Sequence, residues 1–208
     1  MLVLAFDTCM DKMYITLMRD NCVLRSLAVS YEEMQTRSPL LLQTIKDILV
    51  ENELTFQQLD LLATSVGPGG FTAIRTCMTI ARVMAQELDK KLIGVTSFEI
   101  LENLPIDYLG KQKLVALDAR RDSAYVSIAG DIKGIMPVSQ VQDIVDSGDY
   151  FVVTDDKLQA LIGGISYQEL GLPLGEIIAK VAMDKALSQS GNWGELTPLY
   201  LAAPANAK

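Results

Sequence analysis

The sequence contains no histidine among its 208 residues. The chain therefore has no Ser-His-Asp or Cys-His catalytic arrangement, no histidine general base and no histidine metal ligand. Its cysteines, Cys9, Cys22 and Cys77, lie far apart and form no C-x-x-C pair. Neither a disulfide framework nor a zinc site is indicated, and this cysteine usage fits a reducing cytosol.

Positive charge and long apolar runs are also scarce. The 18 Lys and Arg residues face 26 Asp and Glu residues, for a net charge of −8 and a pI of about 4.6. This balance argues against autonomous binding of nucleic acid, which needs clustered cations. The apolar start, Met1–Asp7, is short and lacks a basic segment, so it predicts a strand and not a signal peptide. No run approaches the length of a membrane span, and we expect a cytoplasmic protein.

Half of the residues are hydrophobic, and the central stretch 61–88 organises them. A short apolar strand leads into the glycine turn 67–70, which leads into a helix of about five turns. This layout presents backbone N–H groups at a helix N-terminus, where anions bind. Asp7 and Thr8 end the first strand, where such a pair can hold a metal–phosphate group. A vestigial nucleotide or anion loop would comprise Asp7, Thr8, Gly67, Gly69 and Gly70. The alternatives are an Asx-type turn and a turn that needs glycine for packing.

Two helices of the first half carry more apolar surface than one sheet face requires. The apolar arc of the 71–88 helix covers roughly half of its circumference. The helix near 38–50 has a regular apolar stripe, with Leu40 and Val50 outside it. We therefore expect a partner interface on these helices, against the alternative that the arc is ordinary core. Its predicted residues are Leu40, Thr44, Ala73, Cys77, Met78, Ala81 and Met84. No catalytic residue and no metal ligand is predicted.

The order of predicted elements in the first half is β-β-β-α-β-α-β-α, which indicates a mixed sheet flanked by helices. Residues 4–17 also align with residues 115–128, with identical Ala, Asp, Asp and Tyr at four positions. Duplication is favoured over chance similarity between two hairpins. We therefore predict two lobes, 1–104 and a smaller 105–208. In the second, we expect a strand at 150–154 and helices at 155–162 and 173–189. The charged turn 118–122 is either solvated or part of a binding edge.

At the nonapeptide 67–75, GPGGFTAIR, the chain resembles the TsaB (YeaZ) family of bacterial proteins needed to make threonylcarbamoyladenosine in tRNA. The family pattern is close to G-P-G-S-F-T-G-[LIV]-R. Further matches are LAFDT at 4–8, GVTS at 94–97, DAR at 118–120 with Tyr125, and PLYL at 198–201. The chain departs from the pattern at Gly70 (usually Ser), Ala73 (usually Gly), Arg37 (often His) and Ala202 (often Arg). The loss of the Ser hydroxyl at Gly70 weakens a nucleotide role for the loop.

The resemblance implies an α/β fold of the duplicated actin-like ATPase (ASKHA, ribonuclease H-like) type, with two lobes that each have a mixed sheet flanked by helices. It also implies a non-catalytic subunit, without peptidase activity, that binds and activates a catalytic paralogue, TsaD. The ATPase TsaE joins them, tRNA is bound only through the complex, and a homodimer forms when TsaD is absent. This chain would need no cofactor, whereas its partners use ATP and a divalent metal. The alternative is a stand-alone actin-like ATPase or small-molecule kinase that uses Asp7, Thr8 and the glycine turn.

Overall fold

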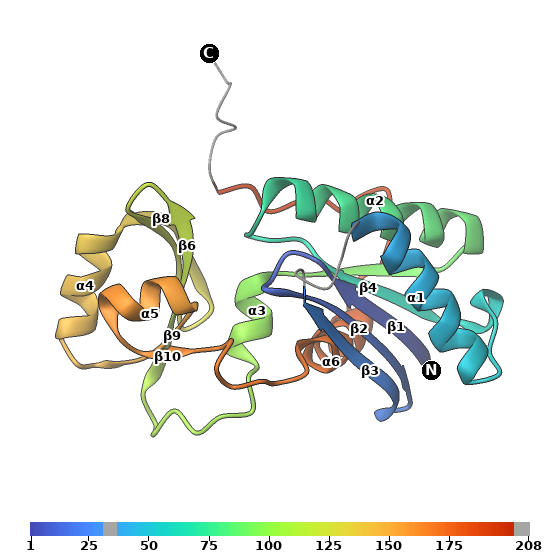
Figure 1. The fold of residues 1–208 in the computed structure, drawn as a ribbon, viewed down its shortest axis with the longest axis horizontal. Coiled ribbons are helices and arrows are strands. Elements are labelled where there is room, and N and C mark those ends of the chain that lie inside the picture. The colour runs from blue at the N-terminus through green and yellow to red at the C-terminus, as the bar shows by residue number, and fades with distance from the viewer. Residues whose placement is uncertain (31–36, 202–208) are drawn as a thin grey trace, which may run out of the picture. The chain divides into compact units, whose positions relative to one another are not determined.

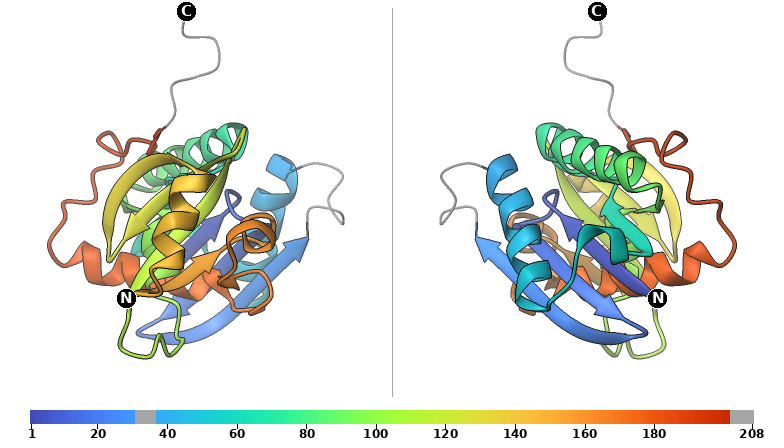
Figure 2. Two further views of the ribbon diagram at one scale, coloured as in Figure 1. Left: turned by 90° about the vertical axis from the view of Figure 1, so that its left-hand side faces the viewer. Right: turned by 90° about the vertical axis from the view of Figure 1, so that its right-hand side faces the viewer.

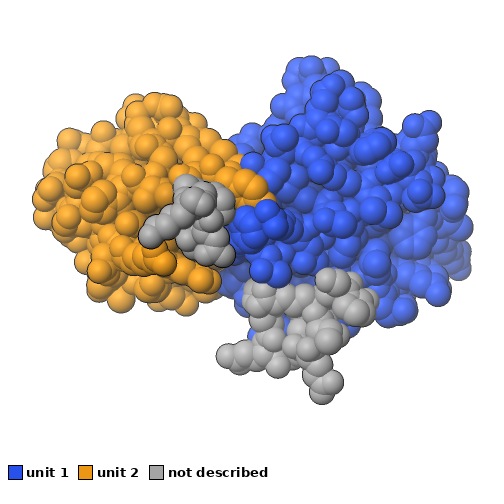
Figure 3. Space-filling model, turned by 90° about the horizontal axis from the view of Figure 1, so that it is seen from above, with its two compact units in different colours: residues 1–100, 173–198 blue, residues 101–172, 199–208 orange. Residues whose placement is uncertain are grey.

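The computed structural model describes residues 1–30 and 37–201, with the side chains of residues 37–39 left out. Contacts divide the chain into two compact units. The first unit comprises residues 1–100 and 173–198, and the second comprises residues 101–172 and the C-terminal residues from 199 onward. Figure 3 colours the two units separately. Ala202, one of the departures from the family pattern, lies outside the described residues.

The first unit is built on a five-stranded sheet with the order β3-β2-β1-β4-β5. β1 pairs antiparallel with β2 and parallel with β4, so the sheet is mixed, as predicted. β1 and β4 are buried along their whole length, as expected for strands covered on both faces, and both begin with an apolar run, at 2–6 and 61–63. The strands are β1 (Leu2–Asp7), β2 (Lys12–Arg19), β3 (Cys22–Ser30), β4 (Leu61–Ser65) and β5 (Lys91–Val95).

Helices cover both faces of this sheet (Figures 1 and 2). α1 (Arg37–Glu51) and α2 (Phe71–Leu88) share a core cluster with Phe6 and Ile15 on one face. α6 (Leu174–Ala186) packs against β1, β2, β4 and β5 on the opposite face. Gly175 permits this approach, because a Cβ there would lie 2.5 Å from Thr16 Oγ1. The 3-10 helix η2 (Phe56–Gln58) leads into β4, and α3 (Ser97–Glu102) follows β5.

The second unit repeats the same topology with shorter elements. Its five-stranded sheet has the order β10-β9-β6-β7-β8. This is the order of the first sheet read from its β5 edge, with β6 to β10 in the places of β1 to β5. α4 and α5 pack with the sheet around Ala116, Val126 and Leu158. The elements are β6 (Gln112–Arg120), β7 (Ser123–Ile128), β8 (Asp131–Pro137), α4 (Val138–Asp146), β9 (Tyr150–Thr154), α5 (Asp156–Ile162) and β10 (Ile165–Ser166).

The duplication expected from the sequence repeat is confirmed, because both aligned segments form an antiparallel hairpin at the start of a unit. The hairpins differ at their turns. Asp7 pairs with Tyr14 in the first, whereas a bulge between Asp118 and Arg120 shifts the second, so that Leu117 pairs with Tyr125. The element order predicted for the first half, β-β-β-α-β-α-β-α, recurs in the second half.

The expected division into 1–104 and 105–208 needs a correction. The first boundary falls within a few residues of the expected position, but residues 173–198 return to the first unit. The reason is the apolar face of α6, whose residues Leu174, Ile178 and Ala182 are buried while the helix packs on the first sheet. β8 and α4 were not predicted, and α4 buries only Val141.

Candidate functional site

The carboxylate of Asp7 is fully buried at the end of β1. Its Oδ1 accepts hydrogen bonds from the Ser65 hydroxyl and from the Cys9 N–H at 2.9 Å, and its Oδ2 accepts one from the Met10 N–H at 3.0 Å. This is the Asx-type turn that the sequence left open as an alternative. The neighbouring Thr8 hydroxyl donates to the Ala73 carbonyl at 3.1 Å. Both side chains therefore stabilise the junction of β1 with β4 and α2.

The glycine turn between β4 and α2 closes against the Asp7 turn. A Cβ at Gly69 would lie 3.0 Å from the Cys9 carbonyl oxygen, so glycine favours this close packing. The Ser97 N–H donates to the Gly67 carbonyl and the Ser97 hydroxyl donates to the Pro68 carbonyl, each at 2.8 Å. Around Gly70, by contrast, a Cβ would meet only Ala73 Cβ at 3.7 Å. The serine usual at this family position would therefore fit here.

Burial raises the pKa of the Asp7 carboxyl, although the Ser65, Met10 and Cys9 hydrogen bonds oppose the shift. A raised pKa means that the native state binds more protons than the unfolded state between the two pKa values. The free energy of unfolding contributed by this group therefore falls as the pH rises above about 4. We expect wild-type protein to lose stability relative to Asp7→Asn over this range, as measured by urea unfolding at a series of pH values. A stability difference that does not change with pH would contradict this assignment.

Five of the predicted interface residues are not available to a partner. Ala73, Cys77, Met78, Ala81 and Met84 are at most 8% exposed. Cys77, Ala81 and Met84 belong to the core cluster of the first sheet, and Met78 packs in a smaller cluster with Val66 and Ile74. Their prediction as a contact surface was therefore wrong, because the apolar arc of α2 is used mainly for the core. Burial also raises the pKa of the Cys77 thiol to about 12, which leaves it without thiolate character at neutral pH.

The exposed apolar residues of the two helices lie elsewhere. Phe71 and Val83 on α2 are 44% and 54% exposed, and Leu42 and Val50 on α1 are 44% and 65% exposed. The two remaining predicted residues, Leu40 and Thr44, are half-buried on α1. The exposure of Val50 agrees with its position outside the apolar stripe. Exposed apolar residues thus occur on both predicted helices, but on α2 they are different residues from those predicted.

The counterpart of Asp7 in the second unit, Asp118, has a different environment. Its side chain is 25% exposed and pairs with Lys157 at 2.8 Å. It also accepts a hydrogen bond from the Arg120 N–H at 3.1 Å. The turn that follows holds Arg120, Arg121 and Asp122 at positive φ. Asp118 is thus a surface residue of a tight turn, whereas Asp7 is part of the core.

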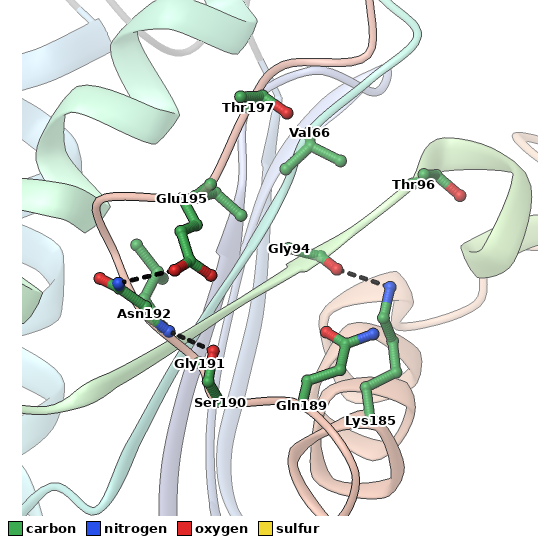
Figure 4. A pocket seen from close by; sticks show the side chains of 12 residues that line it. Val66, Gly94, Thr96, Lys185, Gln189, Ser190, Gly191, Asn192, Glu195 and Thr197 are labelled. Atoms are coloured by element: carbon green, nitrogen blue, oxygen red, sulfur yellow. Dashed lines mark hydrogen bonds between the residues drawn. The ribbon is translucent and has the colours of Figure 1, made fainter.

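A polar groove of about 420 Å³ lies along β5 in the first unit (Figure 4). Its walls are the end of α6 and the C-terminal segment that follows it. Lys185 Nζ donates to the Gly94 carbonyl at 2.8 Å and pairs with Glu99 at 2.7 Å. Sequence reasoning missed this groove, because it combines residues from distant segments and no single motif marks it. Among the residues that the structure describes, no group of three His, Cys, Asp or Glu side chains is placed to hold a metal.

Comparisons with known proteins identify the family. The model of the family described as TsaD, tRNA N6-adenosine threonylcarbamoyltransferase, matches residues 35–148, which is more than half of the chain. The TsaB protein of Buchnera aphidicola (Schizaphis graminum strain) is 30% identical over 125 residues, 60% of this chain and 58% of the relative. Escherichia coli TsaB is 28% identical over 126 residues, 60% of this chain and 53% of the relative. The chain belongs to this family, in its TsaB (YeaZ) group. The aligned part spans a little over half the length of these curated TsaB relatives.

Solved structures support the fold of the TsaB (YeaZ) group. A Pseudomonas aeruginosa protein described as similar to peptidase YeaZ superposes with a TM-score of 0.75 at 18% identity, covering 97% of this chain and 99% of that chain. YeaZ from Pseudomonas aeruginosa gives a TM-score of 0.73, also at 18% identity, and covers 96% of this chain and 99% of its own. The duplicated actin-like α/β fold is thus confirmed. At this identity the likeness concerns the fold alone, so the word peptidase assigns no activity to this chain. No helix in the described part of the chain is long and apolar enough to cross a membrane.

Proposed function

We propose that this chain acts in the synthesis of threonylcarbamoyladenosine in tRNA, as a non-catalytic subunit that binds and activates a larger TsaD. Membership of the family supports the pathway, because the model it matches describes a tRNA N6-adenosine threonylcarbamoyltransferase and its curated relatives are named as tRNA threonylcarbamoyladenosine biosynthesis proteins. The proposal extends to TsaE as the ATP-dependent third subunit and to tRNA bound only through the complex. A cytoplasmic location and a homodimer in the absence of TsaD belong to the same proposal.

The observation that carries the partner role is the exposed apolar surface of α1 and α2. Leu42, Val50, Phe71 and Val83 are each between 44% and 65% exposed. Covering such side chains removes apolar area from water, at about 25 cal/mol per Å². Aromatic residues, phenylalanine among them, are enriched in protein interfaces. The half-buried Leu40 and Thr44 lie on the same helix and remain candidates for the contact.

The non-catalytic role is supported by the Asp7 turn, in which the carboxylate is hydrogen-bonded within the fold. In a nucleotide site, the carboxylate at this place would have to face a metal or phosphate. Here both oxygens of Asp7 accept hydrogen bonds from Ser65, Cys9 and Met10 within the fold. The chemistry of the complex, with its ATP and divalent metal, is therefore assigned to the partner subunits, and this chain would need no cofactor of its own.

Co-expression with a tagged TsaD from the same organism tests this proposal. We expect Val83→Glu and Leu42→Glu to lose co-purification with TsaD and to lower tRNA modification in a reconstituted assay. Leu161→Glu is the matched control, because Leu161 is a similarly exposed apolar residue (57%) on α5 of the second unit. Unchanged co-purification of both helix variants would contradict the proposal. Micromolar binding of Mg-ATP with turnover by the isolated chain would instead favour a stand-alone ATPase or kinase.

A further inference from the structure

β5 is an edge strand of the first sheet, and its outer edge faces the polar groove. Within the described part of the chain, β5 pairs with β4 alone, and the Val66 N–H donates to the Val95 carbonyl on that side. Because both main-chain groups of one residue point to the same side of a strand, Leu92, Gly94 and Thr96 turn theirs away from β4. These alternate residues are the ones from this segment that line the groove.

Several of the outward groups are already engaged. The Leu92 N–H donates to the Gly191 carbonyl at 2.8 Å, and the Gly94 carbonyl accepts from Lys185. The Thr96 N–H donates to Glu99 at 2.7 Å. The remaining pair is the Leu92 carbonyl and the Gly94 N–H, and no hydrogen bond within the described residues joins them to another group. In a parallel pair of strands, one residue of the added strand can donate its N–H to the Leu92 carbonyl and accept from the Gly94 N–H with its own carbonyl.

The walls of the groove leave room at this pair. On one side, the segment 190–197 is attached to the unit by the Gly191 contact and by the hydrogen bond from Arg82 to the Leu196 carbonyl. On the other side stand Lys185 and Gln189, from α6 and the turn after it, as Figure 4 shows. Leu196 packs over Gly94, because a Cβ on Gly94 would lie 2.5 Å from the Leu196 Cδ1. The volume of about 420 Å³ lies within the range of about 300–1,000 Å³ found for ligand sites.

The charges around the groove favour a basic occupant. Lys185 is neutralised by its ion pair with Glu99. Glu195 then remains as a lining carboxylate whose contact is a neutral one, the Asn192 side-chain amide at 3.1 Å. The chain as a whole carries a net charge of −8, which also favours a cationic ligand. A basic side chain or an ammonium group next to the bound amide would complement Glu195.

We propose that this groove binds a short extended peptide segment of a partner protein, which adds one residue to the edge of β5 and carries a basic group toward Glu195. The main-chain bonds would run from the peptide N–H to the Leu92 carbonyl and from the Gly94 N–H to the peptide carbonyl. This is strand addition at a sheet edge, in which the main chain contributes affinity and a neighbouring side chain contributes selectivity. The surface is formed by different residues from the exposed apolar positions of α1 and α2.

Amide NMR of the full ¹⁵N-labelled chain tests the proposal with the capped peptide acetyl-Ala-Lys-Ala-methylamide. We expect a saturable shift of the Gly94 amide proton and slower exchange of that proton with solvent. An analogue that is N-methylated at all three residues and capped with a dimethylamide has no main-chain N–H to donate to the Leu92 carbonyl and is expected to bind about tenfold more weakly or worse. An unchanged Gly94 signal, or equal binding of the methylated analogue, would overturn the proposal.

A charge test separates peptide selectivity from general attraction to an acidic protein. Glu195→Gln is expected to weaken binding of the lysine peptide by about two- to five-fold, as for an exposed ion pair. Glu87→Gln removes the same charge from the exposed face of α2 and is expected to leave binding unchanged. A corresponding peptide with Glu in place of Lys should bind more weakly than the lysine peptide. If both peptides bind alike, or both variants lose affinity alike, the basic occupant is excluded.

Discussion

Met78→Glu is expected to destabilise the first unit strongly and not merely to detach a partner. Met78 is 4% exposed and packs with Val66 and Ile74 in a small apolar cluster. Replacing a buried methionine by a small residue costs about 2–5 kcal/mol, and burying an unpaired carboxylate adds to that cost. Since whole domains are stable by only about 5–15 kcal/mol, we expect a loss of at least 4 kcal/mol. Circular dichroism during urea unfolding measures it.

Val83→Glu is the matched control for this substitution. Val83 lies on the same helix but is 54% exposed, so the new carboxylate remains in water. Exposed substitutions of this kind usually change stability by no more than about 0.5 kcal/mol. A folded, cooperative Met78→Glu variant with near wild-type stability would show that the inner face of α2 is not core in solution. Met78 would then be accessible to a partner subunit.

Asp7→Ala is expected to destabilise the protein by about 3 kcal/mol, because it leaves buried hydrogen-bond donors without acceptors. The groups affected are the Ser65 hydroxyl and the N–H groups of Cys9 and Met10. Relief from the burial of the carboxylate, the same effect that raises the pKa of Asp7, offsets part of this cost. Urea unfolding at neutral pH gives the difference from wild type.

Asp118→Ala provides an internal comparison, because the repeat places Asp118 at the position equivalent to Asp7. Its pairing with Lys157 is solvent-exposed, and such pairs contribute about 0–1 kcal/mol. We therefore expect Asp118→Ala to cost about 1 kcal/mol or less. Equal losses for the two variants would contradict the distinction between a core aspartate and a surface aspartate. Binding of Mg-ATP lost selectively in Asp7→Ala would point to a ligand role instead.

Local patterns were sufficient to predict most elements of the first unit. The apolar run at β1, the stripe of α1 and the strand–turn–helix at β4 and α2 each have one dominant period, and each was found within about two residues of its expected bounds. The repeat correctly indicated the second hairpin. β8 and α4 were missed because their exposed residues interrupt the period, and only Val141 of α4 is buried.

Features that depend on distant contacts were not predictable in the same way. An apolar arc shows that a helix face is covered, but it does not distinguish a sheet of the same chain from another subunit. That ambiguity explains why Ala81 and Met84 were assigned to an interface although they lie in the core. The direction of the Asp7 carboxylate depends on Ser65, which lies 58 residues away. The groove along β5 depends on Lys185 and Glu195, which lie about 90 to 100 residues after β5 in the sequence and line the groove beside it.

The return of α6 to the first sheet has a consequence for synthesis on the ribosome. The strands β1, β2, β4 and β5 are translated early, but the helix that covers one of their faces comes from residues 174–186. Until those residues leave the exit tunnel, that side of the nascent sheet stays bare and open to chaperones. The unit that starts first is therefore completed only after all of the second unit's strands have been made.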